Sequence, residues 1–483
     1  MKQLRTLSLA FALLLPGQAF AEELALQPVI AAALDHDSKV AHADIKVSQA
    51  EGQAEQASGV FDWTANATAG WARLYYPRVQ TVGGTPVLTD GLENSWDPKI
   101  TAGATKLFRD GIQIQPGITF YPGASVSQAQ TFGLTRPVPS LNVKIPLTEG
   151  LDYNNPAEAN EQASFNEVDG ARMERAAAQQ QAAMGAAQTY WRCLAVSEEE
   201  SVLEANQQSA LAFVDAQRKL MAAGQITALA LEQTLSGQVE RDRELDQARK
   251  EDVDCRSTLS SLLKRDSDMT FPTLAVAFPK MDELLPAATA LRETSLVNTA
   301  LRNRPDLQAL EQYVTAARER LAAARNERDP KINLLLDPNG FFVDFTYSLE
   351  GNTEQGGEDS AAAKAADANL NLSELQDQIR RDISEGVGAL RTSLATLADR
   401  RRSQETLTQV VDDAQHAVQT GGMDRTTLRS LEDQRTDAAV QLVQARLDCA
   451  LNLAALRLVT GMVVVDGGDA AAQDAGLFMS AQF

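Results

Sequence analysis

Cysteine and histidine are the residues with which this chain could bind a metal or attack a substrate, and both are sparse. The sequence holds three cysteines and three histidines among 483 residues. None of the cysteines belongs to a Cys-x-x-Cys pair, which argues against a structural zinc site. No nucleophile-elbow, phosphate-loop, zinc-protease or dinucleotide-binding motif stands in a suitable context. We therefore expect no cofactor, no metal site and no enzymatic activity.

Two of the cysteines are placed symmetrically about a glycine. Cys193 and Cys255 each lie 31 residues from Gly224. If the chain reverses at Gly224 between two antiparallel helices, both cysteines stand at the same height, which allows a disulfide in an oxidising compartment. Equal height does not make the side chains face each other, so two buried free thiols are the alternative. Cys449 has no evident partner and is expected to be a small core residue.

Charged residues after a second glycine turn, at Gly421, could line a pore. The candidates for a pore constriction are Asp424, Arg425, Glu432 and Asp433. Solvated turn charges are the alternative for Asp424 and Arg425. Two charge runs, Glu198–Glu200 and Arg400–Arg402, are expected to be solvated helix faces or ion pairs between helices.

The first 21 residues have the pattern of a secretory signal peptide. Lys2 and Arg5 precede a short apolar run, and Ala19–Ala21 fits the small-x-small cleavage rule. The run is too short to span a bilayer as a helix, and the next residue, Glu22, is not the cysteine of a lipid anchor. No later stretch approaches 18 unbroken apolar residues, so membrane insertion would require a β-barrel.

The composition is acidic and poor in aromatic residues. The net charge is -21, and it becomes -23 without Lys2 and Arg5. Such a charge argues against nucleic acid or anionic lipid as a partner. Aromatic residues make up only 5% of the sequence, which favours extended helical packing of small side chains over several globular cores.

The chain contains an unequal internal repeat. The segment from Ala33 aligns with the segment from Ala300 at an offset of 267, whereas the turn at Gly224 aligns with the turn at Gly421 at an offset of 197. The first half therefore carries 70 more residues between its first helix and its turn. Each half reads as helix, strands, long helix, turn and returning helix.

Several segments alternate strictly between apolar and polar residues, as strands do when one face is apolar and the other wet. These segments are Trp63–Trp71, Lys99–Leu107, Ile112–Phe120, Leu141–Ile145, Lys331–Leu336 and Phe341–Leu349. Trp63 and Trp71 are separated by roughly 26 Å along a strand, close to the ~25 Å between the two aromatic girdles of a membrane barrel. Two core tryptophans in a soluble sandwich are the alternative.

The predicted helices are long. A helix from Asn155-Pro156 to Ala223 would reach roughly 100 Å, and one from Asp359 to Thr420 about 93 Å. Each is followed by a glycine turn and a returning helix, over Ile226–Leu263 and Met423–Val459. Ser38–Ser58 and Pro305–Glu327 are shorter helices. A coiled-coil seam is predicted at Val196, Leu203, Ala210, Val214 and Met221.

These features together resemble the TolC-like outer membrane efflux family over almost the whole mature chain. The matching segments are Arg304–Pro330, Pro146–Gly150, and the two glycine turns with Leu231 and Leu428 seven residues later. Each is weak alone, but their order, spacing and duplication are specific. The family often has Asp six residues after the turn glycine; Ala230 and Thr427 stand there instead, so any closing network at the turns must differ.

The resemblance implies a mixed, mainly α-helical fold in which three protomers form a 12-stranded β-barrel, four strands each, joined to a long periplasmic α-helical barrel. The alternating hairpin Lys99–Phe120 is additional; we interpret it as an extracellular extension, with an 18-stranded barrel as the alternative. The expected domains are 1–21 signal peptide, 22–263 first repeat, 264–293 equatorial connecting segment, 294–460 second repeat and 461–483 flexible tail.

The resemblance also implies a channel subunit of a tripartite efflux or type I secretion system in the outer membrane. Its partners would be two further copies, a periplasmic adaptor (membrane fusion) protein, an inner-membrane pump and outer membrane lipid. The turns would form the periplasmic tip that contacts the adaptor, through Gly224, Gln225, Ile226, Thr227, Gly421, Gly422 and Met423. Trp63 and Trp71 would belong to the membrane girdle. The rival interpretation is a periplasmic coiled-coil structural protein without a pore.

Overall fold

The computed structural model describes residues 24–122, 137–148, 155–264, 274, 278–279, 291–338 and 340–463. The predicted signal peptide, nearly all of segment 264–293 and most of tail 461–483 lie outside the described residues. The chain divides into two compact units. We call residues 43–175 and 305–377 the sheet unit, and residues 1–42, 176–304 and 378–483 the turn unit.

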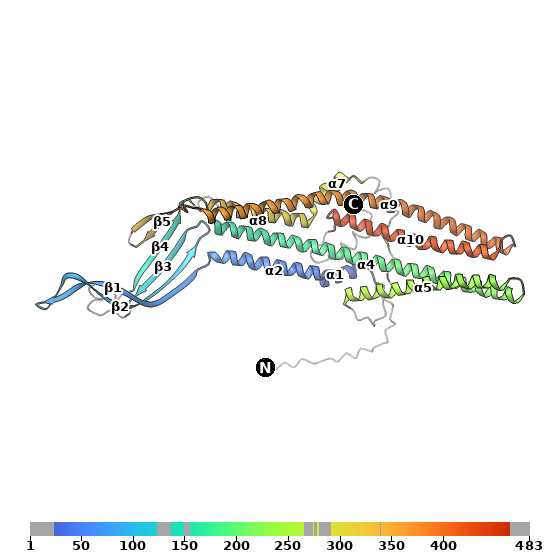
Figure 1. The fold of residues 1–483 in the computed structure, drawn as a ribbon, viewed down its shortest axis with the longest axis horizontal. Coiled ribbons are helices and arrows are strands. Elements are labelled where there is room, and N and C mark those ends of the chain that lie inside the picture. The colour runs from blue at the N-terminus through green and yellow to red at the C-terminus, as the bar shows by residue number, and fades with distance from the viewer. Residues whose placement is uncertain are drawn as a thin grey trace, which may run out of the picture. The chain divides into compact units, whose positions relative to one another are not determined.

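Helices account for most of the described chain (Figure 1). They are α1 (Leu26–His36), α2 (Ser38–Ser58), α4 (Pro156–Ala222), α5 (Ala228–Leu263), α7 (Glu293–Asn303), α8 (Pro305–Asn326), α9 (Asn352–Gln419) and α10 (Arg425–Val459), with a short 3-10 helix η1 (Gly59–Phe61). The predicted bounds of α2 are confirmed exactly and those of α4 within two residues, whereas α9 begins seven residues earlier than predicted. In the described part of the chain, none of the helices contains an apolar stretch of the length needed to span a bilayer.

The strands form one antiparallel sheet in chain order. They are β1 (Thr64–Val82), β2 (Thr85–Leu107), β3 (Gln113–Phe120), β4 (Val138–Pro146), β5 (Lys331–Asp337) and β6 (Gly340–Thr346). The sheet therefore has six strands in this chain, one for each of the six predicted alternating segments. The hairpin Lys99–Phe120 belongs to this sheet, because β2 pairs with β1 on one side and with β3 on the other, and β3 pairs with β4.

The register places like residues on like faces across all six strands. The apolar face carries Ala65, Ala67, Ala69, Trp71, Ile100, Ala102, Ala104, Ile114, Ile118, Leu141, Val143, Ile145, Ile332, Leu334, Leu336, Phe341, Val343 and Phe345. The opposite face carries Thr64, Asn66, Thr68, Thr101, Thr105, Gln113, Gln115, Thr119, Ser140, Asn142, Lys144, Lys331, Asn333, Asp344 and Thr346. Exceptions include Leu74, Leu107, Val138, Leu335 and Phe342 on the polar face, and Arg73 and Lys106 on the apolar face. The sheet is thus a wall with one apolar and one polar side.

β1 and β2 continue past the rest of the sheet as a two-stranded arm (Figure 1). The arm ends in a tight turn at Gly83 and Gly84, whose φ angles of 65° and 86° suit a hairpin turn that requires glycine. The sequence prediction ended the first strand at Trp71 and missed this arm, because strict alternation of apolar and polar residues stops there.

Ion pairs join the helices of the sheet unit. Arg172 binds Glu51 at 2.8 Å, which ties α4 to α2. Arg320 forms two hydrogen bonds to Glu167, one of them at 2.9 Å, which ties α8 to α4. Gly170 of α4 faces the ring of Tyr313 of α8, so these two helices approach closely where α4 has no side chain.

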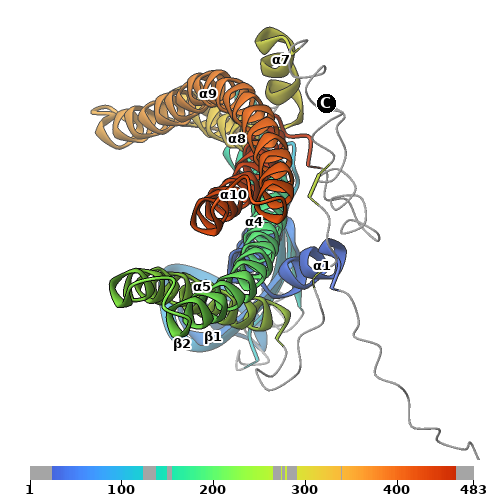
Figure 2. The same ribbon diagram turned by 90° about the vertical axis from the view of Figure 1, so that its right-hand side faces the viewer.

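In the turn unit, four helices lie side by side in the order α5, α4, α10, α9 (Figures 1 and 2). Leu203 of α4 packs with Leu245 and Ala248 of α5, and Val440 of α10 packs against the same cluster. Arg400 of α9 donates to Gln441 of α10. Leu203, Ala210 and Val214 of the predicted seam are buried, whereas Met221, near the turn, is exposed.

Candidate functional site

The turn between α4 and α5 depends on a glycine in the left-handed conformation. Gly224 has a φ of 73°. Its N–H donates to the carbonyl of Met221 at 2.9 Å, and the N–H of Gln225 donates to the carbonyl of Leu220 at 2.9 Å. This closing pattern satisfies the last carbonyls of α4, and it favours glycine because other residues are strained at such a φ.

The turn between α9 and α10 repeats this geometry. Gly421 has a φ of 79°. The N–H of Gly421 donates to Val418 O at 3.2 Å, and the N–H of Gly422 donates to Ala417 O at 2.8 Å. The two turns that were aligned in sequence are therefore built by the same backbone hydrogen bonds.

Each returning helix begins with a side-chain cap. The hydroxyl of Thr227 accepts from the N–H of Ala230 at 3.3 Å, and the carboxylate of Asp424 accepts from the N–H of Thr426 at 3.1 Å. Asp424, a candidate for the pore constriction, thus has a structural role as the N-cap residue directly before α10. Arg425, the next candidate, is exposed.

Most of the predicted contact residues lie open at the turns. Gly224, Gln225, Thr227, Gly421 and Gly422 are exposed. Ile226 and Met423 are half-buried. The turns therefore present backbone and small polar groups beside two partly covered apolar side chains.

The other two constriction candidates, Glu432 and Asp433, belong to a polar cluster around Arg429, which is only 8% exposed. We define the Arg429 cluster as Arg429, Glu432 and Asp433 of α10, Asn206 and Ser209 of α4, and Arg241 of α5. The guanidinium of Arg429 donates to Asn206 Oδ1 at 2.6 Å. It also forms ion pairs with Asp433 and, at 3.5 Å, with Glu432. Because the bond to Asn206 runs between helices, the cluster holds α10 against α4.

Asp433 is the centre of this cluster. Its Oδ1 accepts from Asn206 at 3.3 Å and lies 3.6 Å from the guanidinium of Arg241. Arg241 also pairs with Asp437 at 3.4 Å. The carboxylate of Glu432 accepts from the hydroxyl of Ser209 at 2.8 Å. Three helices are thus joined by charge-assisted hydrogen bonds.

The sequence interpretation missed Arg429, Asn206 and Arg241. Arg429 stands three and four residues before Glu432 and Asp433, which is the spacing of side-chain pairs on one helix face. That spacing could have identified Arg429 from the sequence. Asn206 and Arg241 could not be found in this way, since they lie on other helices and meet the cluster only after packing.

A groove opens between this cluster and the turns. Its lining includes Phe213, Gln217, Ile226, Gln238, Asp424 and Arg429. The groove mixes aromatic, amide and charged side chains and contains no pairing of a nucleophile with a base. Among the described residues, no three His, Cys, Asp or Glu side chains lie close enough to hold a metal ion.

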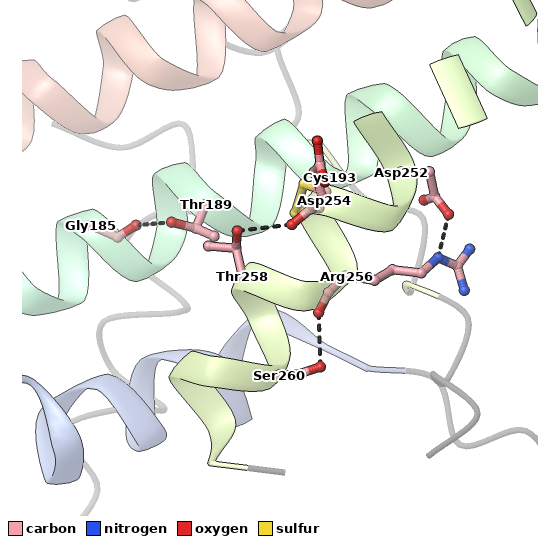
Figure 3. The surroundings of a disulfide bond; sticks show 9 residues. Gly185, Thr189, Cys193, Asp252, Asp254, Arg256, Thr258 and Ser260 are labelled. Atoms are coloured by element: carbon pink, nitrogen blue, oxygen red, sulfur yellow. Dashed lines mark hydrogen bonds and ion pairs between the residues drawn. A yellow bond between two sulfur atoms is a disulfide. The ribbon is translucent and has the colours of Figure 1, made fainter. Parts of the chain in front are cut away.

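Cys193 of α4 and Cys255 of α5 form a disulfide, with a Cα–Cα distance of 5.4 Å (Figure 3). The bond joins the two arms of the first helical hairpin at a distance from its turn. Cys449 of α10 is a free, fully buried thiol, and burial raises its pKa to about 11. This thiol is therefore protonated and unreactive at neutral pH.

Trp63 and Trp71, the two predicted girdle tryptophans, are solvent-exposed in the single chain. The side chains of Trp63 and Trp71 are 57% and 70% exposed. Trp96, which the sequence interpretation did not single out, is also exposed and lies opposite Arg73, two residues along from Trp71 on the same face. The apolar face of the sheet thus carries two uncovered tryptophans, Trp71 and Trp96, and a third, Trp63, directly precedes β1. This arrangement favours an apolar partner.

No protein-family model matches the sequence. No curated protein matches it either. Solved structures do match over nearly the full length. The outer membrane channel CmeC of Campylobacter jejuni has a TM-score of 0.64 at 14% identity, over 94% of this chain and 89% of that chain. The outer membrane protein VceC of Vibrio cholerae has a TM-score of 0.62 at 16% identity, over 90% and 96%.

The open state of the MtrE outer membrane channel of Neisseria gonorrhoeae is similar to the same degree, with a TM-score of 0.63 at 14% identity over 90% of this chain and 88% of that chain. Coverage of this extent includes both the sheet and the helical hairpins. A sequence identity of 14–16%, together with these TM-scores, shows that the fold is shared. The chain has the fold of the TolC-like outer membrane channels.

Proposed function

We propose that this protein is the outer membrane channel subunit of a tripartite efflux or type I secretion system. The observation that carries the proposal is the sheet described above, in which one side is mainly apolar and partly exposed and the other side is mainly polar across the six strands. An apolar side of this kind suits lipid, and a polar side suits a water-filled lumen. The similarity in fold to CmeC, VceC and MtrE supports the same function.

In this proposal three copies associate, so that the sheets close into one barrel and the helical hairpins form a sleeve across the periplasm. A closed barrel leaves no strand edge in lipid, where an unpaired backbone group costs several kcal/mol. The channel formed by the barrel and the helical hairpins conducts its substrate passively, and the energy for export comes from an inner-membrane pump.

The exposed turns at Gly224 and Gly421 are the proposed contacts for a periplasmic adaptor protein. The Arg429 cluster lies close behind them and holds α10 against α4 and α5. We infer that this cluster stabilises the closed tip, and that adaptor docking shifts the hairpins and separates its ion pairs. The cluster thereby takes the place of the Asp that the family often carries six residues after the turn glycine.

Membrane fractionation followed by electrophoresis without heating tests the proposal. We expect the protein in the outer membrane fraction as a trimer that dissociates on heating, since barrel assemblies resist detergent until heated. A soluble monomer in the periplasmic fraction would contradict the proposal and would favour a coiled-coil scaffold without a pore.

A further inference from the structure

The additional hairpin of the sheet is fastened at the end of the wall where the strands meet the helices. Its turn is closed by the N–H of Phe108 donating to the carbonyl of Ile112 at 2.8 Å. Arg109 makes two hydrogen bonds of 2.7 Å to Glu161 of α4, whose side chain is only 1% exposed. The amide of Asn155, which directly precedes α4, donates to the carbonyl of Arg109 at 3.2 Å. The turn is therefore anchored to the start of a helix, and it cannot lie at the far end of the strands as an extracellular extension would require.

The hairpin also has its polar and apolar residues on the same sides of the sheet as the neighbouring strands. Thr101 of β2 stands opposite Thr119 of β3 on the polar side, and Ala102 stands opposite Ile118 on the apolar side. On the next boundary, Gln115 of β3 stands opposite Asn142 of β4. A hairpin that lay outside the membrane would be in water on both faces. A shift of its register by one residue would exchange the two faces without burying or exposing apolar surface, so nothing would favour the observed register.

The two outer edges of the sheet have no strand partner among the described residues, since β1 pairs only with β2 and β6 only with β5. Phe341 and Phe345 of β6 are 75% and 64% exposed. Six strands are too few to close on themselves around a polar side, because even eight strands enclose only enough space for their own side chains. The partner of each edge must therefore come from another copy of this chain. Six is an even number, so β6 of one copy meets β1 of the next in the antiparallel sense.

We propose that the membrane barrel of this protein has eighteen strands, six from each of three copies. The inference rests on the trimer of the proposed function and goes beyond it. Barrel diameter grows nearly in proportion to strand number, so this barrel would be about one and a half times as wide as a twelve-stranded one. The outer membrane section would then pass bulky solutes or polypeptides, and selection by size would fall to the helical part of the duct.

Electron cryo-microscopy of the purified full-length protein tests the inference by the number of strands in the barrel wall. We expect threefold particles with eighteen strands, including β2 and β3. Threefold particles with twelve strands and a projecting hairpin would overturn the inference and leave the proposed function intact. Particles without threefold symmetry would overturn both.

Cysteine labelling in intact cells supplies a second test, in a C449A background that leaves only the native disulfide. T119C and I118C are adjacent positions on opposite faces of β3. We expect a water-soluble maleimide to modify T119C, which faces the lumen, at least tenfold faster than I118C, which faces lipid. Equal, rapid labelling of the two variants would place β3 in water on both sides and overturn the inference.

Discussion

At the scale of single residues, burial of charge has the clearest consequences. The run Glu198–Glu200 was expected to be a solvated face or a set of ion pairs, and it lies half-buried. Glu198 pairs with Arg446 at 3.5 Å, and Glu200 with Arg249 at 3.7 Å. Glu199 has no such pair among the described ion pairs. Its pKa is raised above its ordinary value by burial and by the nearby charge of Glu251.

This raised pKa gives a stability prediction for Glu199→Gln. Because the native state holds the proton more tightly than the unfolded state, wild-type stability falls as pH rises through the interval between the ordinary pKa and the raised one. At pH 7 the variant should therefore be more stable, with a Tm higher by roughly 1–3 °C. The gain should shrink as pH falls towards 4, where the wild-type carboxyl is protonated. Thermal unfolding measured at both pH values checks this, and a gain that is equal at both would contradict it.

At the scale of elements, the close approach of α4 and α8 depends on Gly170. A Cβ built on Gly170 would lie 2.6 Å from the ring of Tyr313, whereas a Cβ on Gly185, in the same helix, would meet nothing within 4 Å. We expect Gly170→Ala to destabilise the protein by about 1–3 kcal/mol. The matched control Gly185→Ala should instead stabilise it by about 0.5–1 kcal/mol, since alanine favours the helix. Similar unfolding midpoints for the two variants would show that the helices do not approach at Gly170.

The Arg429 cluster gives a prediction about gating. Arg429→Ala removes the donor that joins α10 to Asn206 and leaves Asp433 with fewer partners, so the closed state should lose stability. We expect the variant channel to be open for a larger fraction of the time in lipid bilayers, by at least tenfold. Arg429→Lys keeps the charge but loses the forked geometry, and should give an intermediate value. If Arg429→Ala conducts as the wild type does, the cluster does not hold the tip closed.

The helical elements could be predicted from the sequence closely, whereas the sheet could be predicted only in part. Uninterrupted runs without proline determine α4, and local glycine and cap residues determine the turns at Gly224 and Gly421. The place of the hairpin Lys99–Phe120 could not be predicted, because alternation reveals the faces of a strand but not its neighbours. The anchor between Arg109 and Glu161 fixes the turn of the hairpin against α4, and these residues are 52 positions apart.

The same limit applies to the candidate site. The exposed turns follow from local signals, but the ion pairs behind them join three helices and depend on how these helices pack. Asp424 illustrates the difference: as a sequence feature it could line a pore, and in the fold it caps α10. Glu432 and Asp433 were predicted as constriction residues, whereas their partner Arg429 emerged only from the packed structure.

At the scale of the whole molecule, one property unites the wall and the helices. The wall has a polar and an apolar side over all six strands, and the long helices are joined by ion pairs and small side chains. Among the described residues, few aromatic side chains are buried in either the wall or the helices. Both are suited to lining an assembly with water inside, and this is the central claim of the account.

The most direct measurement is electrical conductance of the purified full-length protein in a planar lipid bilayer. We expect discrete, uniform current steps, each from one inserted trimer, that are absent when the protein is unfolded before addition. A correctly folded preparation that associates with the bilayer and never raises its conductance, even as Arg429→Ala, would contradict the account.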